Sequence, residues 1–286
     1  MSKDTELHIV LVCHTELDFD GSWQLFEKIQ PKIEDVFDQI FKETGKNPKV
    51  TYCITEEFLS EHLEDIFRFI EEGHEIGIHS HLPGSQRKNG HTYKGRYAYC
   101  IDENGVLNQD RIAGAIRQMA IALDIPPPVT HVSGMFTFHT NTIQVLEEAG
   151  FKVDCSLVPG EKLKHPATGD FILADNSRHK EFYPYRPSTS DPWIEGRSSI
   201  IELPVSGNLG GGDIKSQINY LRNRLRGDLS VDVFQSFWHH FEFAELGWTK
   251  GTLNDVYEFL MMCAVERNVI FSTALEAVRR LEELGL

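Results

Sequence analysis

Short apolar runs alternate with helix-like stretches along the whole chain, and this alternation is the feature that most restricts its fold. The runs typical of buried strands lie at residues 8–13, 50–54, 75–79, 129–133, 152–156, 198–205, 233–238 and 269–271. Between them, apolar residues recur at helical spacing, for example at 33, 36, 37, 40 and 41 and at 59, 63, 66, 67 and 70. Repeated strand–helix units form parallel sheets. The pattern therefore predicts an α/β fold, a distorted (β/α) barrel of about seven parallel strands.

Two polar segments interrupt this rhythm. Residues 84–108 and 160–197 show no clear periodicity, so both are predicted to be irregular. The first follows the strand at 75–79, and barrel enzymes vary their specificity through such loops, so we expect it to line a substrate cleft. No break in composition marks a second domain, and residues 1–286 are predicted to form one barrel domain.

Charge and cysteine usage narrow the possible partners and the compartment. The 28 Lys and Arg residues against 43 Asp and Glu residues give a net charge of −15, which argues against nucleic acid and anionic membranes as partners. No apolar run is long enough to span a membrane, and no signal-peptide core precedes the first strand. The five cysteines are scattered without a paired spacing. A cytoplasmic protein is expected. The charge indicates nothing about the substrate, and the sequence does not indicate the oligomeric state.

Polar clusters stand at the ends of several predicted strands. His79 and His81 are two residues apart, so on a strand both imidazoles would point to one side, as a metal site needs. Glu16 and Asp18 follow the first strand, and His239 ends another. Barrels of this kind place their sites where parallel strands end. We therefore expect a divalent metal, Zn²⁺ by ligand type, held by His79, His81 and an acidic residue of the first strand.

The order of these segments resembles the polysaccharide deacetylase superfamily, the metal-dependent carbohydrate esterases with the NodB-type fold. The resemblance covers nearly the whole chain and is carried by four segments. They are Gly73 to His81, Phe136 to Leu157, Ile201 to Ser206 and Phe237 to Glu242. It implies a NodB-like barrel and a metal-dependent deacetylase that hydrolyses the amide of an N-acetylated sugar or a carbohydrate-derived substrate.

The resemblance also implies roles for particular residues. By position, His14 stands where the family has its catalytic base, Glu16 where it has a metal-binding acid, and His239 where a histidine serves as general acid. Asp18 is a second candidate acid in the first motif, so the implied catalytic residues are His14, Asp18 and His239, and the implied metal ligands are Glu16, His79 and His81. The chain departs from the family at Pro83, where a second metal-binding histidine usually stands, and at Val132, where an arginine usually holds the base.

Structural interpretations stand beside these functional ones. His14 is also explained as a hydrogen-bonded histidine at a strand end, Glu16 and Asp18 as a solvated loop or as caps of the next helix, and His81 as a turn residue. Neighbours on a strand face opposite sides, so one of His239 and His240 is expected to be structural. The glycine run at 210–212 lacks the ending of a phosphate loop and predicts a flexible turn.

Two other functions remain open at this point. Pro83 and Val132 favour a carbohydrate-binding protein that keeps the barrel without the full catalytic set. The third possibility is hydrolysis of another non-peptide C–N bond in a small molecule, as some relatives of this fold perform.

Overall fold

The structure is a computed structural model that describes residues 5–18, 21–80, 108–139, 141–164, 172–211, 214–224, 230–243 and 251–286. Its elements, in chain order, are β1 (Glu6–Thr15), α1 (Gln24–Thr44), β2 (Val50–Ile54), α2 (Glu56–Glu61), α3 (Leu63–Glu71), β3 (Glu75–Ser80), α4 (Asn108–Ala122), β4 (Thr130–Ser133), the 3₁₀ turn η1 (Gly134–Phe136), α5 (Thr142–Ala149) and β5 (Val153–Asp154). These are followed by β6 (Lys162–Lys164), β7 (Ile172–Asp175), η2 (Asn176–Arg178), β8 (Ile201–Glu202), β9 (Val205–Asn208), α6 (Ile214–Arg224), β10 (Val231–His239), η3 (His240–Phe243), α7 (Leu253–Val265), β11 (Val269–Phe271) and α8 (Ala274–Glu283).

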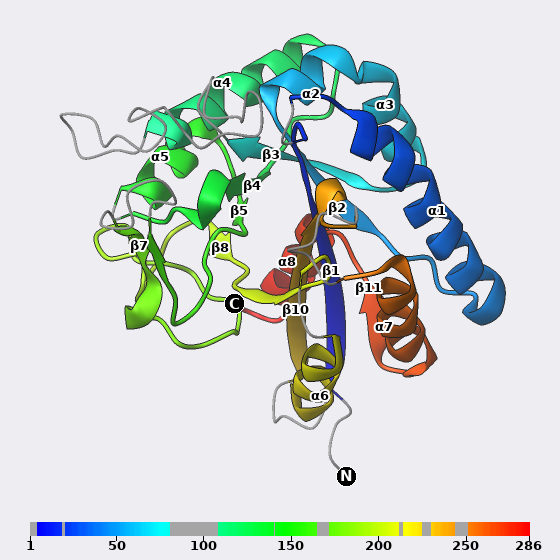
Figure 1. Cartoon of the computed structure of the whole chain (residues 1–286). Coiled ribbons are helices and arrows are strands. Elements are labelled where there is room, and N and C mark those ends of the chain that lie inside the picture. The colour runs from blue at the N-terminus through cyan, green and yellow to red at the C-terminus, as the bar shows by residue number, and fades with distance from the viewer. Residues whose placement is uncertain are drawn as a thin grey trace.

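The main sheet is parallel, as the alternation of strands and helices predicts. Its strands run in the order β8-β5-β4-β3-β2-β1-β10-β9, and β11 pairs with the start of β1. Helices α1, α3, α4 and α7 lie around the outside of this sheet (Figure 1). The small antiparallel pair β6 and β7 forms a separate sheet.

One chain segment joins the two ends of the sheet and closes it into a distorted barrel. β8 pairs with β5, and only two residues later β9 pairs with β10. The backbone N–H of Leu203 donates to the carbonyl oxygen of Asp154 (2.8 Å), and that of Val205 donates to the carbonyl oxygen of Leu157 (2.8 Å). Val205 also stands in register with Gln235 of β10. Pro204, which has no N–H to give to a ladder, lies at the change of partner. Because β8 and β9 belong to one segment, the nine described strands of this sheet, β11 included, form eight parallel segments, which confirms the prediction of about seven.

The alternation of side chains along β1 separates two apolar clusters. Leu7, Ile9 and Leu11 point outward into the larger cluster beneath the helices, whereas Val10 and Val12 point into the barrel. The inner cluster includes Ala274, Ala277, Val278 and Leu281 of α8, which contacts both β1 and β5. Ser272 and Ala274, at the start of α8, bond to Ile9 and Thr51 in the first half of the barrel. The N-terminal end of the barrel is therefore filled, and polar residues gather at the C-terminal end.

Three local predictions differ from the structure. The helix expected over 59–70 is divided into α2 and α3, because His62 leaves the helical conformation (φ −125°, ψ 40°) and its ring stacks on Phe58. The strand expected over 198–205 is shorter at its start and changes partner within the segment. The region 160–197, predicted to be irregular, contains β6, β7 and η2.

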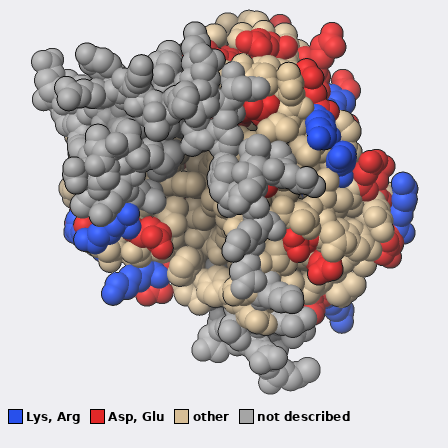
Figure 2. Space-filling view, in the orientation of Figure 1, with Lys and Arg blue, Asp and Glu red and all other residues tan. Residues whose placement is uncertain are grey.

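Charges on the face shown in Figure 2 are mixed in sign. Acidic side chains gather at the upper right, where α2 and α3 lie in Figure 1, and Lys and Arg form small separate groups at the rim. Within the described part of the chain, no helix combines the length and the apolar character needed to cross a membrane.

Candidate active site

The C-terminal ends of β1, β3 and β10 bring together the side chains that the sequence singled out. His14 pairs in register with His239 of β10 on one side of β1 and with Cys53 of β2 on the other. β3 lies next to β2 and carries His79 one residue before its end. His14 shares its side of β1 with Val10 and Val12, so it continues the inner face of the barrel at the open end.

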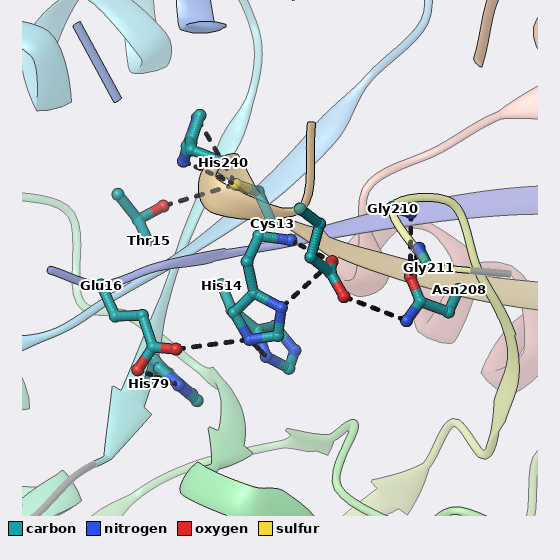
Figure 3. Close-up of polar contacts among 11 residues, drawn as sticks. Cys13, His14, Thr15, Glu16, His79, Asn208, Gly210, Gly211 and His240 are labelled. Atoms are coloured by element: carbon teal, nitrogen blue, oxygen red, sulfur yellow. Dashed lines mark hydrogen bonds and ion pairs between the residues drawn. The ribbon is translucent and has the colours of Figure 1, made fainter. Parts of the chain in front are cut away.

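Four side chains converge there, as Figure 3 shows for His14, Glu16 and His79. Nδ1 of His14 lies 3.2 Å from Nε2 of His239, and the rings of His14 and His79 have centroids 4.6 Å apart. The carboxylate of Glu16 lies between two histidines, 3.6 Å from Nε2 of His79 and 3.4 Å from Nε2 of His239. His14 and His79 are almost fully buried, so these polar groups interact where water screens them little.

Two aromatic rings pack against the histidine cluster. Phe136 and Phe237 lie with ring centroids 5.2 and 5.1 Å from that of His14. Phe136 has a φ of 51°, which is unfavourable for a bulky residue, so the backbone of η1 holds this ring in place at an energetic cost. Neither phenylalanine was predicted as a site residue, because an aromatic side chain in an apolar run is usually core. Their position gives the cluster an apolar wall.

His79 is oriented as a metal-binding histidine would be. Its Nδ1 lies 3.1 Å from the backbone carbonyl oxygen of Val132, an acceptor, so Nδ1 carries a proton, and Nε2, which faces Glu16, is the nitrogen left to bind a proton or a cation. An imidazole Nε2 and a carboxylate are ligands that Zn²⁺ accepts, and this pair fits the expected metal in chemistry. In the described ranges, however, no set of three or more His, Cys, Asp and Glu side chains is arranged to hold a metal.

Some predicted residues cannot be placed. His81, the third predicted ligand, lies outside the described residues, as do residues 84–107 of the loop expected to line the cleft. The metal site and the cleft loop therefore remain predictions.

Asp18 is turned toward the start of α1. Its Oδ2 accepts hydrogen bonds from the backbone N–H of Leu25 (2.8 Å) and from the Ser22 hydroxyl (3.3 Å). These contacts supply an acceptor to a first-turn N–H of the helix, which agrees with the capping interpretation. The catalytic role implied for Asp18 remains an untested prediction.

His239 and His240 face opposite sides, as expected for neighbours at the end of a strand. His240 is buried, with its Nε2 2.9 Å from Gln30 Oε1 and its ring against Phe26. Burial, together with the nearby His239, lowers the pKa of His240 to about 3. A histidine that stays neutral under the helices is structural, and His239 is the one that enters the cluster.

A second, fully buried polar cluster, which no sequence pattern predicted, lies on the helix-facing side of β3, β4, β5 and β8. His131 Nδ1 lies 2.8 Å from Asp154 Oδ1 and its Nε2 lies 2.8 Å from the Ser80 hydroxyl. Each of these three residues has 0% of its surface exposed, so Ser80 is not placed to attack a substrate. Glu202, also inaccessible, hydrogen-bonds Asp154, and its pKa is raised well above the ordinary value because burial and the Asp154 charge oppose its ionisation.

Neither a protein-family model nor a curated protein matches the sequence. Solved structures share its fold at low identity. A protein described as a polysaccharide deacetylase from Pseudomonas aeruginosa PAO1 is 14% identical, with a TM-score of 0.61 over 99% of this chain and 93% of that one. The PuuE allantoinase is also 14% identical, with a TM-score of 0.62 over 99% and 92%. A protein described as a polysaccharide deacetylase from Mycobacterium smegmatis is 16% identical, with a TM-score of 0.55 over 97% and 91%.

At these identities the likeness concerns the fold. The chain has the barrel of the polysaccharide deacetylases, so the expected NodB-like architecture is confirmed. The same barrel occurs in a 4-alpha-glucanotransferase from Thermococcus litoralis (15% identity, TM-score 0.59), of which the match covers 40%. One fold thus serves different reactions, and the reaction has to be inferred from the site.

Proposed function

We propose that the protein is a metal-dependent hydrolase of non-peptide C–N bonds, a deacetylase acting on an N-acetylated sugar or a carbohydrate-derived substrate. The observation that carries the proposal is the convergence of His14, Glu16, His79 and His239 at the open end of a deacetylase-type barrel. Buried imidazoles beside a carboxylate combine the groups needed for proton transfer and for metal binding.

Glu16 and His79 would hold the divalent metal, for which Zn²⁺ is the first candidate and His81 the predicted third ligand. When bound, such an ion lowers the pKa of a water molecule and polarises the acyl carbonyl. His14 occupies the position of the family's catalytic base, and it is proposed to take the proton of the attacking water. His239 is proposed to give a proton to the leaving amine. General acid catalysis of this kind raises the rate about 10²–10⁴-fold. Phe136 and Phe237 would limit the access of other water to these groups.

The test is hydrolysis by the purified chain, supplied with Zn²⁺, Mn²⁺ or Co²⁺. N-acetylglucosamine oligosaccharides are the first substrates, and their hydrolysis is measured as released acetate and as the new primary amine. Allantoin is the second, because the PuuE allantoinase shares the fold and the same residues would suit a small C–N substrate.

Each outcome assigns a function. Acetate release supports the deacetylase, and cleavage of allantoin alone supports the smaller C–N substrate. Saturable oligosaccharide binding without any product, with every metal, would favour the carbohydrate-binding protein and reject the hydrolase.

A further inference from the structure

Glu242 is the residue that holds His239 in place. It lies three residues after His239 in η3, and its side chain is almost fully buried. Oε2 of Glu242 accepts the backbone N–H of His239 (2.7 Å) and lies 3.2 Å from Nδ1 of the same residue. Oε1 accepts a hydrogen bond from Nδ2 of Asn208 at 3.2 Å. The carboxylate therefore connects β9 to the histidine of the site.

The orientation of Asn208 is fixed from the other side. Its Oδ1 accepts the backbone N–H groups of Gly210 (2.8 Å) and Gly211 (2.9 Å), as the labelled residues in Figure 3 show. Because the oxygen is committed to two donors, the amide nitrogen must point at Glu242. The glycine turn also makes room, since a Cβ on Gly210 would stand 2.3 Å from Oε2 of Glu242.

Both oxygens of residue 242 must consequently accept. One faces the Asn208 amide and the other faces the His239 backbone N–H, so an uncharged amide at 242 would turn an N–H toward another N–H. Although burial raises the pKa of Glu242, hydrogen bonds from His239 and Asn208 and the positive charge of a protonated His239 hold it below its ordinary value. An acceptor at Oε2 also requires that Nδ1 of His239 carries a proton, whether the ring is neutral or charged.

Nε2 of His239 then faces the site. It lies 3.2 Å from Nδ1 of His14 and 3.4 Å from Oε1 of Glu16. We propose that Glu242, with its polarity set by Asn208, is the positioning residue that keeps the proton on Nδ1 of His239 and presents Nε2 to the reacting groups. The catalytic consequence rests on the proposed function, whereas the position of the proton does not.

The test exchanges the direction of the hydrogen bonds. In Glu242→Gln the amide cannot satisfy Asn208 and His239 together. In Glu242→Gln combined with Asn208→Asp, the glutamine nitrogen can donate to the new carboxylate while its oxygen again faces His239. Asn208→Asp alone sets two carboxylates against each other. The double variant should therefore recover what each single variant loses.

Two properties are measured: the position of the proton on His239 and the turnover. The spectra use the full-length protein with ¹⁵N-labelled histidine at a pH of about 8, above the ordinary pKa of histidine. Long-range ¹H–¹⁵N correlation spectra, assigned with a His239→Gln variant, report which ring nitrogen of His239 carries the proton. The Nδ1-bound proton is expected in the wild type and the double variant and should be lost in Glu242→Gln. Turnover should fall about 10–100-fold in that single variant with little change in KM, and return in the double variant.

Asp65→Asn is the matched control, because Asp65 also lies three residues after a histidine that it contacts, His62, at 3.0 Å. It should change neither readout. An unprotonated Nδ1 in the wild type, a retained Nδ1 proton in Glu242→Gln, or a double variant no better than the single ones would overturn the proposal. Should Glu242→Gln fail to fold, the wild-type and double-variant spectra still decide. If the wild type proves inactive while the spectra behave as expected, the proposed function fails and the positioning role stands.

Discussion

Replacing Glu202 by glutamine should leave the protein folded and should make it relatively more stable as the pH rises. Glu202 is fully buried, and its Oε1 accepts the backbone N–H of Leu157 at 3.0 Å. Its side chain also hydrogen-bonds Asp154, and its pKa is raised well above the usual range by burial and by the Asp154 charge. The residue therefore acts as a neutral acid, with an O–H that faces a carboxylate.

Glutamine can reproduce this arrangement, since its oxygen would accept from Leu157 and its N–H₂ would donate to Asp154. At a pH of about 5 the free energy of unfolding should change by less than about 1 kcal/mol. In the wild type the folded state keeps a proton that the unfolded chain releases above the ordinary glutamate pKa of 4.5. Wild-type stability is therefore lost as the pH rises from this value toward the folded pKa, at a rate of about 1 kcal/mol per pH unit, and the variant escapes that loss.

Urea unfolding followed by tryptophan fluorescence at pH values from about 5 to about 8 measures the effect. Glu202→Leu is the control, because it leaves the Leu157 N–H without its acceptor and should be about 1–3 kcal/mol less stable than Glu202→Gln at every pH. A glutamine variant as unstable as the leucine variant, or a difference from wild type that does not depend on pH, would contradict the assignment of a neutral Glu202.

Three further predictions concern other parts of the molecule. His240 has its pKa lowered to about 3, so unfolding below the ordinary histidine pKa of about 6.5 lets it take up a proton. Acid should therefore destabilise the wild type more than His240→Gln. Unfolding measured at pH values between about 4 and 7 checks this. A Cβ on Gly77 would stand 2.7 Å from Cys53 Sγ. Gly77→Ala should therefore lower the free energy of unfolding by about 1–3 kcal/mol, and adding Cys53→Ala should recover part of this loss. An equal loss with and without Cys53→Ala, measured by thermal unfolding, would contradict this. His239→Ala should lower turnover about 10²–10⁴-fold and leave the metal content unchanged, whereas an effect on metal content instead would assign His239 to the ligands.

Periodicity predicted most of the barrel because buried parallel strands and amphipathic helices leave strong local patterns. The strand predicted at residues 50–54 agrees with the structure. The break at His62 was missed because the helical spacing of apolar residues continues across it. The change of partner at Pro204 was missed because pairing between distant strands has no local signal.

The candidate site was predictable where it lies on strand ends. His14, Glu16, His79 and His239 were selected from their positions and do converge, because parallel strands end together. Asn208 and Glu242 were not selected, since their roles depend on a turn formed by Gly210 and Gly211 that brings β9 against η3. The buried His131–Asp154 pair was missed because each residue alone is an ordinary polar residue in a strand, and pairing between strands has no local signal.

We propose that His79 and Glu16 hold a metal that the reaction requires. The most direct measurement is turnover of N-acetylglucosamine oligosaccharides by protein stripped with a chelator, as Zn²⁺ is added back and bound metal is counted by elemental analysis. Activity should return and saturate at about one metal per chain. His79→Ala should neither bind this metal nor turn the substrate over, while Asp65→Asn should behave as wild type. Full activity of the stripped protein, or an equivalent of metal retained by His79→Ala, would contradict this assignment.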